Sequence, residues 1–244
     1  MLFIEIIYNG GFEPLSIKGN IWLGPSADTL VFFGAKVSPL MTREGGFQVW
    51  RFITPMFIHV GVFHLILNLF AQIPMGFQLE KSLGVWRLAT LYLFGGIGGN
   101  LLSSVFLPNA IECGASTSLF AWISVYIVDY LMHFKYYRGP LRKIVYWIIG
   151  TIISLAIGLL PGIDNFAHLG GSMLGFSVAM VILNPINKSL VDSSRWIRYR
   201  IIGVLLSLAY LLIFFYVFYF VADVTEECEW CNYISCLPEF KSWC

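Results

Sequence analysis

The sequence predicts an all-α fold, a polytopic membrane helix bundle, from two observations. The first is composition: 58% of the 244 residues are hydrophobic and 12% are charged, whereas soluble proteins carry about 25% charged residues. The second is a series of apolar runs of about 18 residues or more, the length that a helix needs to cross a bilayer. These runs lack the strict alternation of membrane β-strands, so we expect helices.

Six runs are long enough for a complete span. The stretch before Gly10 is too short for another and is interpreted as the end of a helix or an interfacial segment. It also lacks the charged start and the cleavage site of a signal peptide. The predicted spans are 53–76, 86–107, 115–133, 144–161, 164–184 and 201–222.

Basic residues predict the orientation of the bundle. Ten of the fifteen Lys and Arg residues fall in three connecting segments, 77–87, 134–143 and 185–200. Because positive charge accumulates in cytoplasmic loops, we expect these segments on the cytoplasmic side of a plasma membrane or endomembrane. Segment 1–50 and the tail 223–244 would then be extracytosolic. The net charge of +1 and the lack of a basic patch with interleaved aromatics argue against nucleic-acid binding.

The tail carries four of the five cysteines, Cys228, Cys231, Cys236 and Cys244. An even number in an oxidising compartment favours two disulfides, and the pairing stays open among three possibilities. The alternative is a metal site, since Cys228 and Cys231 have CxxC spacing, but we favour disulfides. We interpret Cys113 as a small buried residue.

Three polar side chains interrupt the first predicted span. His64 and Asn68 are four residues apart, so they lie on one face of a helix, and His59 lies a little over one turn before His64. Polar groups inside a membrane are costly and need an explanation. They either hydrogen-bond to neighbouring helices or line a polar pocket, and three on nearly one face favour the two interpretations about equally.

Ser116 lies at the outer start of the third predicted span, in the run ECGASTSLFAW. Gly114 and Ala115 before it allow another backbone to approach closely. A helix start also offers N–H groups without intrahelical acceptors, which suit a developing oxyanion. On this segment alone, a plain helix-capping serine is the favoured interpretation.

His168 lies about one turn inside the fifth predicted span, in GIDNFAHLGGSMLGF. Gly171 and Gly175 form a GxxxG pair, a pattern that favours close helix packing in membranes. His168 is one turn from that face. The alternative is an incidental histidine beside a packing contact.

The direction of the spans brings these candidates together. The first, third and fifth spans run from outside to inside, so we expect Ser116 and His168 to meet at one face. A neutral imidazole activates a serine hydroxyl by taking its proton. His64, Asn68 and the N–H of Ser116 would supply donors for an oxyanion. Asp164 is the one acidic residue near His168 in the sequence, and we expect it to stabilise the positive end of the helix dipole rather than to contact the imidazole. The pattern therefore predicts a Ser–His dyad rather than a triad.

Several segments resemble, in order and in register, the signatures of the rhomboid family of intramembrane serine proteases. The resemblance extends from about Glu5 to about Phe176. The segments are HVGVFHLILN, similar to the HxxxxHxxxN signature; GAST, similar to GxSG; AHLGGSMLG, similar to the histidine helix; VWRFITPMFIH, similar to the WR region of the first loop; and LEKSLG, similar to the turn after the second family helix.

The resemblance implies roles for five residues of the predicted site. Ser116 would be the nucleophile and His168 the base. His64 and Asn68 would help to form the oxyanion hole, and His59 would be a supporting polar residue near it. The family's chemistry needs no cofactor and no metal.

Further residues would have supporting roles by the same resemblance. Phe120, one turn after the nucleophile, is at the position whose ring packs on the catalytic histidine. Trp50 and Arg51 would be structural residues of the first loop, and Glu80 a structural hydrogen-bonding acid.

Two positions depart from the family pattern. Thr117 replaces the glycine that usually follows the nucleophile, and its β-branch would crowd the oxyanion site. Gln48 stands where an acid often precedes the WR pair, which would weaken an ion pair with Arg51 and affect the stability of the loop rather than the chemistry.

The resemblance divides the chain into four parts within one membrane domain. Segment 1–50 is an apolar outer segment with the end of a largely missing first family helix, and it is expected to lie against the membrane or the bundle. Residues 51–185 form the rhomboid catalytic core. Residues 186–222 form a cytoplasmic loop and the last of the six complete spans, the family's extra C-terminal helix, and 223–244 form the cysteine-rich tail.

Two functions are compatible with these patterns. The leading hypothesis is a serine endopeptidase of the bilayer that cuts single-span membrane proteins in or near their transmembrane segment. The alternative is a catalytically weak or inactive rhomboid relative that binds membrane proteins for trafficking or degradation. That alternative predicts loss of the serine or the histidine, and both are present.

Overall fold

The computed structural model describes residues 1–15, 20–159, 163–185 and 193–221, together with Cys228, Cys231 and Ile234. Within these ranges the chain is helical, and its β-type pairing is a single antiparallel bridge between Lys36 and Glu112. Five helices are long and apolar enough to cross a membrane, and α6 is a slightly shorter apolar helix. The predicted all-α bundle is confirmed. The six predicted spans correspond to α4 (Val62–Leu83), α5 (Val85–Phe106), α6 (Ser116–Met132), α7 (Pro140–Ile157), α8 (Asn165–Ile182) and α9 (Ser193–Phe220).

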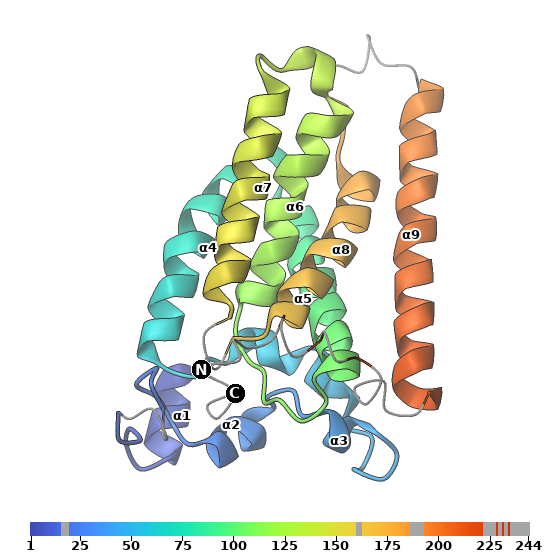
Figure 1. Ribbon diagram of the computed structural model, residues 1–244. Helices are drawn as coiled ribbons and strands as arrows, with labels where there is room; N and C mark the ends of the chain where they lie inside the picture. Colours follow the sequence, from blue (N-terminus) through green and yellow to red (C-terminus); the bar gives the residue numbers. More distant parts are fainter. Residues whose placement is uncertain are drawn as a thin grey trace.

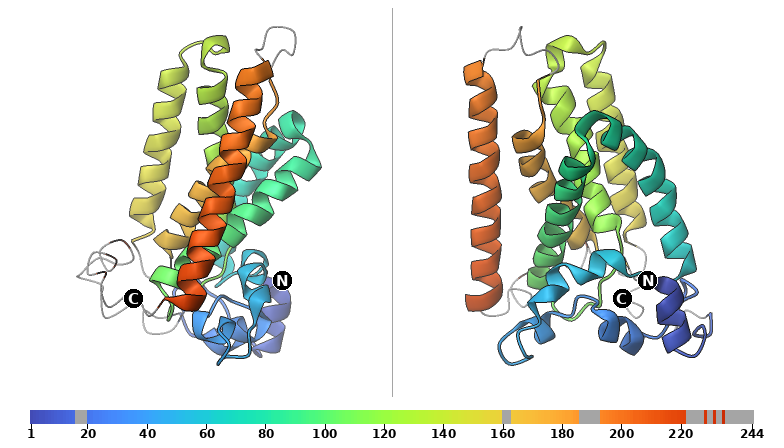
Figure 2. Two further views of the ribbon diagram at one scale, coloured as in Figure 1. Left: turned by 90° about the vertical axis from the view of Figure 1, so that its right-hand side faces the viewer. Right: turned by 180° about the vertical axis from the view of Figure 1, so that it is seen from behind.

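Helix α6 lies near the middle of the bundle and packs against α4, α5, α7 and α8, while α9 lies at one edge (Figure 1). Helix α8 packs against α5, α6 and α9, and α5 and α8 are the most buried of the spanning helices. Helices α7 and α9 expose most of their apolar side chains, as expected for surfaces that face lipid. Figure 2 shows α9 on the opposite side of the bundle from α4.

Glycines bring α5, α6 and α8 into backbone contact. A Cβ atom added at Gly171 would lie 2.1 Å from the carbonyl oxygen of Thr117, and one at Gly175 would lie 2.4 Å from the Cα atom of Ala121. The GxxxG face of α8 therefore lies directly on the backbone of α6, as small residues in membrane helices allow. Similar close approaches occur at Gly95, Gly98, Gly99 and Gly170.

The outer segment folds into short helices at one end of the bundle (Figure 1). Its central tie is Arg51, whose guanidinium donates to the carbonyls of Val31 and Ala35 at 2.9 and 2.6 Å and to Oε1 of Gln48 at 2.7 Å. Gln48 thus supplies a neutral acceptor at the position where the family has an acid. The elements are α1 (Leu2–Tyr8), α2 (Ala27–Phe33), α3 (Ser38–Met41), η1 (Val49–Phe52) and η2 (Thr54–Phe57).

The bounds of the first predicted span, 53–76, are wrong at both ends. Helix α4 begins at Val62, because Pro55 and Gly61 shape the preceding residues into 3₁₀ and extended backbone. A Cβ atom at Gly61 would lie 2.2 Å from the carbonyl oxygen of Trp22, so the outer segment fixes this helix start. The helix then continues to Leu83, and the predicted connection 77–87 reduces to a break at Gly84.

The connections at the other end of the bundle gather the basic residues. The α4–α5 break, the α6–α7 connection with η3 (Phe134–Tyr136) and the start of α9 all lie at the end opposite the outer segment (Figure 1). Nine of the ten residues predicted to be cytoplasmic are described there, and Lys188 lies outside the described residues. The side of the membrane that this end occupies stays a prediction.

One disulfide is described in the tail. Cys228 is joined to Cys231, and both are buried beside Leu102 and Phe166. This bond agrees with the favoured prediction of disulfides in the tail, and it engages the two cysteines whose CxxC spacing suggested a metal site. Cys236 and Cys244 lie outside the described residues, and Cys113 is a buried free thiol.

Replacement of Gly171 by alanine should destabilise the bundle, because the added methyl group meets the backbone of α6. Overpacking of this kind costs about 1–3 kcal/mol. The matched control is Gly150→Ala on α7, where an added Cβ would have no neighbour within 4 Å. Thermal unfolding of the purified variants in detergent measures the effect, and equal midpoints for the two variants would contradict the packing argument.

Candidate active site

Ser116 and His168 form a hydrogen bond at the end of the bundle that carries the outer segment. Ser116 is the first residue of α6, and His168 lies in the first turn of α8. Nε2 of His168 is 2.9 Å from Oγ of Ser116. The parallel course of α6 and α8, with their glycine contact, therefore places an imidazole nitrogen within reach of the serine proton.

The ring of His168 is held by packing rather than by an acid. It stacks on Phe120, with ring centroids 4.2 Å apart and planes 12° apart. Within the part of the chain that the structure describes, Nδ1 of His168 is buried and has no hydrogen-bond partner. Asp164 is engaged elsewhere, since its carboxylate accepts from the N–H of Ala167 and from the hydroxyl of Ser103. The arrangement is a pair, and Asp164 caps α8 as its helix-start position suggested.

His64 lies beside the segment that leads into Ser116. A Cβ atom added at Gly114 would lie 2.5 Å from Cε1 of His64, and the φ angle of Gly114 is +145°. Only glycine fits both the backbone conformation and the close approach. Among the described residues, Nδ1 of His64 is buried without a hydrogen-bond partner. The imidazole of His64 therefore lies beside Gly114, two residues before Ser116, where α6 begins with N–H groups that have no intrahelical acceptor.

The structure does not bring Asn68 and His59 into contact with Ser116. The side-chain amide of Asn68 donates to the carbonyl of His64 at 2.9 Å, one turn back along α4. The prediction that His59 belongs to the helix is wrong, because it precedes the start of α4. Its ring centroid lies 5.6 Å from that of His64, and burial lowers the pKa of His59 to about 4. His59 is therefore a neutral neighbour of His64 near pH 7.

Thr117 is directed away from the serine and into the helix interface. Its side chain is 1% exposed. A Cβ atom at Gly99 would lie 2.0 Å from Cγ2 of Thr117, so the methyl group occupies the place that a side chain at position 99 would need. The threonine is thus accommodated by a glycine on α5.

The residue pattern did not reveal a buried charge cluster behind the site. Lys36 is completely buried, and its ammonium group donates to the carbonyl of Leu107 at 2.7 Å. Its backbone pairs with that of Glu112, which is also buried. These contacts join the outer segment to the loop between α5 and α6. A lone lysine in the apolar stretch VFFGAKVSPL was the available signal.

The pKa values of Lys36 and Glu112 depend on each other and on the carboxylate of Asp164, which caps α8. Burial lowers the pKa of Lys36, while the carboxylates of Asp164 and Glu112 act in the opposite direction. Burial raises the pKa of Glu112 well above its ordinary value, Asp164 raises it further, and Lys36 opposes both. Because Asp164 caps the helix that carries His168, the cluster couples the two loops to the position of the imidazole.

The fold and the Ser–His contact describe a multi-pass membrane protein with a hydrogen-bonded serine and histidine at one end of its bundle. Comparison with known proteins gives the family. The Rhomboid domain matches residues 46–185, and the chain belongs to the rhomboid family. Among the described residues, no group of three His, Cys, Asp or Glu side chains is arranged to hold a metal ion.

Relatives in the family carry different names. The chain is 32% identical to RHOMBOID-like protein 6, mitochondrial, of Arabidopsis thaliana, over 98% of this chain and 82% of the relative. It is 36% identical to Rhomboid-like protease 1 of Toxoplasma gondii, over 75% of this chain and 63% of the relative. It is also 31% identical to Inactive rhomboid protein 1 of Danio rerio, over 84% of this chain and 24% of the relative.

Removal of the buried ammonium group should destabilise the protein. Lys36→Met leaves the Leu107 carbonyl without its donor and the two carboxyl groups without a nearby cation, which costs about 3 kcal/mol. Arg43→Met, an exposed change in the same outer segment, is the control. Thermal unfolding in detergent measures both, and the double variant Lys36→Met with Glu112→Gln should recover part of the loss. An unchanged midpoint for Lys36→Met would overturn this account.

Proposed function

We propose that this protein is an intramembrane serine endopeptidase that uses a Ser116–His168 dyad. The observation that carries the proposal is the 2.9 Å contact between Oγ of Ser116 and Nε2 of His168, inside a bundle of membrane-spanning helices. A serine hydroxyl is a weak nucleophile until a base takes its proton. The family includes Rhomboid-like protease 1 of Toxoplasma gondii, and the name of that relative supports the same assignment.

In the proposed reaction, Nε2 of His168 takes the proton as Oγ of Ser116 attacks the scissile carbonyl carbon. The N–H groups at the start of α6 and the imidazole of His64 donate to the oxyanion. Asn68 joins them after its side chain turns away from the His64 carbonyl. His168 then gives its proton to the leaving amine, and a water molecule, deprotonated by the same imidazole, releases the acyl group from Ser116.

The substrate class follows from the position of the dyad. Ser116 and His168 lie at helix starts, so a substrate helix needs to reach them near its own end. We propose single-span membrane proteins whose helices unwind readily near the cut, with small residues there. Phe120 keeps the imidazole in its ring plane during both proton transfers. By the distribution of basic residues, the dyad lies in the outer half of a plasma membrane or endomembrane, with the tail extracytosolic.

The alternative is a weak or inactive family member that binds membrane proteins. It is favoured by the relative named as an inactive rhomboid protein. The intact dyad argues against it, as does the burial of Thr117 in the helix interface rather than against Ser116. Cleavage of a bound substrate distinguishes the two functions, because an inactive member would bind a membrane protein without cleaving it.

The test replaces Ser116 and His168 individually with alanine and follows cleavage of a tagged single-span protein in cells. We expect each change to lower cleavage by at least about a thousandfold, because the pair acts as a unit. The control is Ser154→Ala, whose hydroxyl donates only to the carbonyl of Gly150 within α7.

A fluorophosphonate probe gives an independent readout on the purified protein. The wild type and Ser154→Ala should be labelled, while Ser116→Ala should not. Full cleavage by either dyad variant would show that the dyad is misassigned. Absence of both labelling and cleavage in the folded wild type would favour the binding function.

A further inference from the structure

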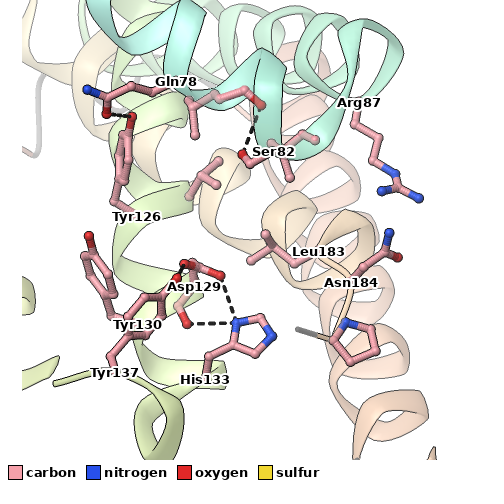
Figure 3. Close-up of a pocket in the computed structure, with 14 residues that line it drawn as sticks. Gln78, Ser82, Arg87, Tyr126, Asp129, Tyr130, His133, Tyr137, Leu183 and Asn184 are labelled. Carbon is pink, nitrogen blue, oxygen red and sulfur yellow. Dashed lines mark hydrogen bonds and ion pairs between the residues drawn. The ribbon is translucent and has the colours of Figure 1, made fainter. Parts of the chain in front are cut away.

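A polar cavity lies at the end of the bundle opposite Ser116. It has a volume of about 430 Å³, within the range of small-ligand pockets. Its walls come from the end of α4, the start of α5, the second half of α6 and the residues that follow α8 (Figure 3). The polar side chains that the argument uses are Arg87, Tyr126, Asp129, Tyr130, His133 and Asn184.

The cavity contains a histidine that is fixed on one side and open on the other. His133 is 1% exposed, and its Nδ1 lies 2.8 Å from Oδ1 of Asp129. The second carboxylate oxygen accepts from the hydroxyl of Tyr137 at 2.5 Å. Because Nδ1–H donates to the carboxylate, Nε2 is left as a hydrogen-bond acceptor. Nε2 is buried, has no hydrogen-bond partner among the described residues, and points away from Asp129 (Figure 3).

The opposite wall carries a cation. Arg87 is partly buried on the cavity and has no carboxylate within ion-pair distance among the described residues. With its amide oxygen turned to the guanidinium, Asn184 accepts from Arg87 at 2.6 and 3.1 Å. A guanidinium has five N–H donors, so several remain for a phosphate. Both oxygens of the Asp129 carboxylate are hydrogen-bonded, one to Nδ1 of His133 and the other to the hydroxyl of Tyr137.

The surroundings add positive charge to the cavity. The ammonium group of Lys143 lies over the rings of Tyr130 and Tyr137 at 5.2 and 4.7 Å. Basic loops at this end are accounted for by membrane orientation alone. Arg87 and His133 are different, because they line a cavity and are partly or fully buried. Their arrangement calls for a ligand with an anionic group and a hydroxyl group.

We propose that this cavity binds the headgroup of an anionic phospholipid whose headgroup is a polyol, such as phosphatidylglycerol or phosphatidylinositol. Arg87 binds the phosphate, and Nε2 of His133 accepts a hydrogen bond from a headgroup hydroxyl. The apolar wall of Leu79, Val125 and Leu183 faces the lipid's glycerol and upper chains. The position at the helix ends, where headgroups lie, favours a lipid over a soluble ligand.

The test measures lipid binding to the purified full chain in neutral detergent, by native mass spectrometry and by the thermal midpoint. Phosphatidylglycerol should bind more tightly than phosphatidylserine, which has charge without a polyol, and than zwitterionic phosphatidylcholine. Arg87→Gln should weaken phosphatidylglycerol binding about tenfold, the value of a charge-assisted hydrogen bond. Lys135→Gln, an exposed change of equal charge outside the cavity, should leave binding unchanged.

A further variant tests the hydroxyl contact, and a soluble probe tests the source of the ligand. His133→Phe should reduce phosphatidylglycerol binding to the level of phosphatidylserine. If this buried variant does not fold, Arg87→Gln still decides the proposal. Glycerol phosphate that binds as tightly as the lipid would overturn the lipid source. Equal binding of phosphatidylglycerol and phosphatidylcholine, or equal losses in Arg87→Gln and Lys135→Gln, would overturn the site.

Discussion

Backbone contact between α6 and α8 is the constraint on which the site depends. Gly171 and Gly175 let α8 lie on the main chain of α6 near Thr117 and Ala121. Side chains of ordinary size would separate the two helices by several ångströms, and a 2.9 Å contact between Ser116 and His168 would then be impossible. In a bilayer no hydrophobic force drives helices together, so close packing of small residues supplies much of the attraction. The same glycines therefore hold the bundle together and set the geometry of its polar pair.

Polar groups at the outer end of the bundle are stabilised by a second layer of contacts. Lys36 joins the outer segment to the loop before α6, and Asp164 caps α8 while it accepts from Ser103. Buried charges are costly unless they are paired or hydrogen-bonded. Here these hydrogen bonds join the outer segment to the loop before α6 and join α5 to the start of α8, close to Ser116 and His168. Nδ1 of His64 and Nδ1 of His168 are among the buried polar atoms that have no hydrogen-bond partner within the described residues.

The two ends of the bundle differ in the chemistry that they present. The outer-segment end holds a serine hydrogen-bonded to one imidazole, and the imidazole of His64 lies beside Gly114. The buried charged groups Lys36 and Glu112 join the outer segment to the loop before α6. The opposite end holds basic side chains around a cavity with one buried imidazole. An Asp129–His133 pair at one end and an acid-free His168 at the other show how hydrogen bonding to Nδ1 distinguishes the two histidines. The cavity and the Ser116–His168 pair have no residue in common, so a substitution at one end does not directly change the contacts at the other.

The sequence by itself determined the helical membrane fold and identified Ser116 and His168 as candidates. It predicted six complete spans, whereas five described helices are long and apolar enough to cross a membrane and α6 is shorter, with 17 residues. Run length, the spacing of small residues and the in-register motifs carry that information, because each depends on local composition. Only the tertiary structure decided that α4 begins at Val62, that His59 lies outside it, that Thr117 faces Gly99, and that Lys36 and His133 are buried in polar clusters. Those features arise where segments distant in the sequence meet, and no local pattern specifies which backbone atoms a side chain will find there.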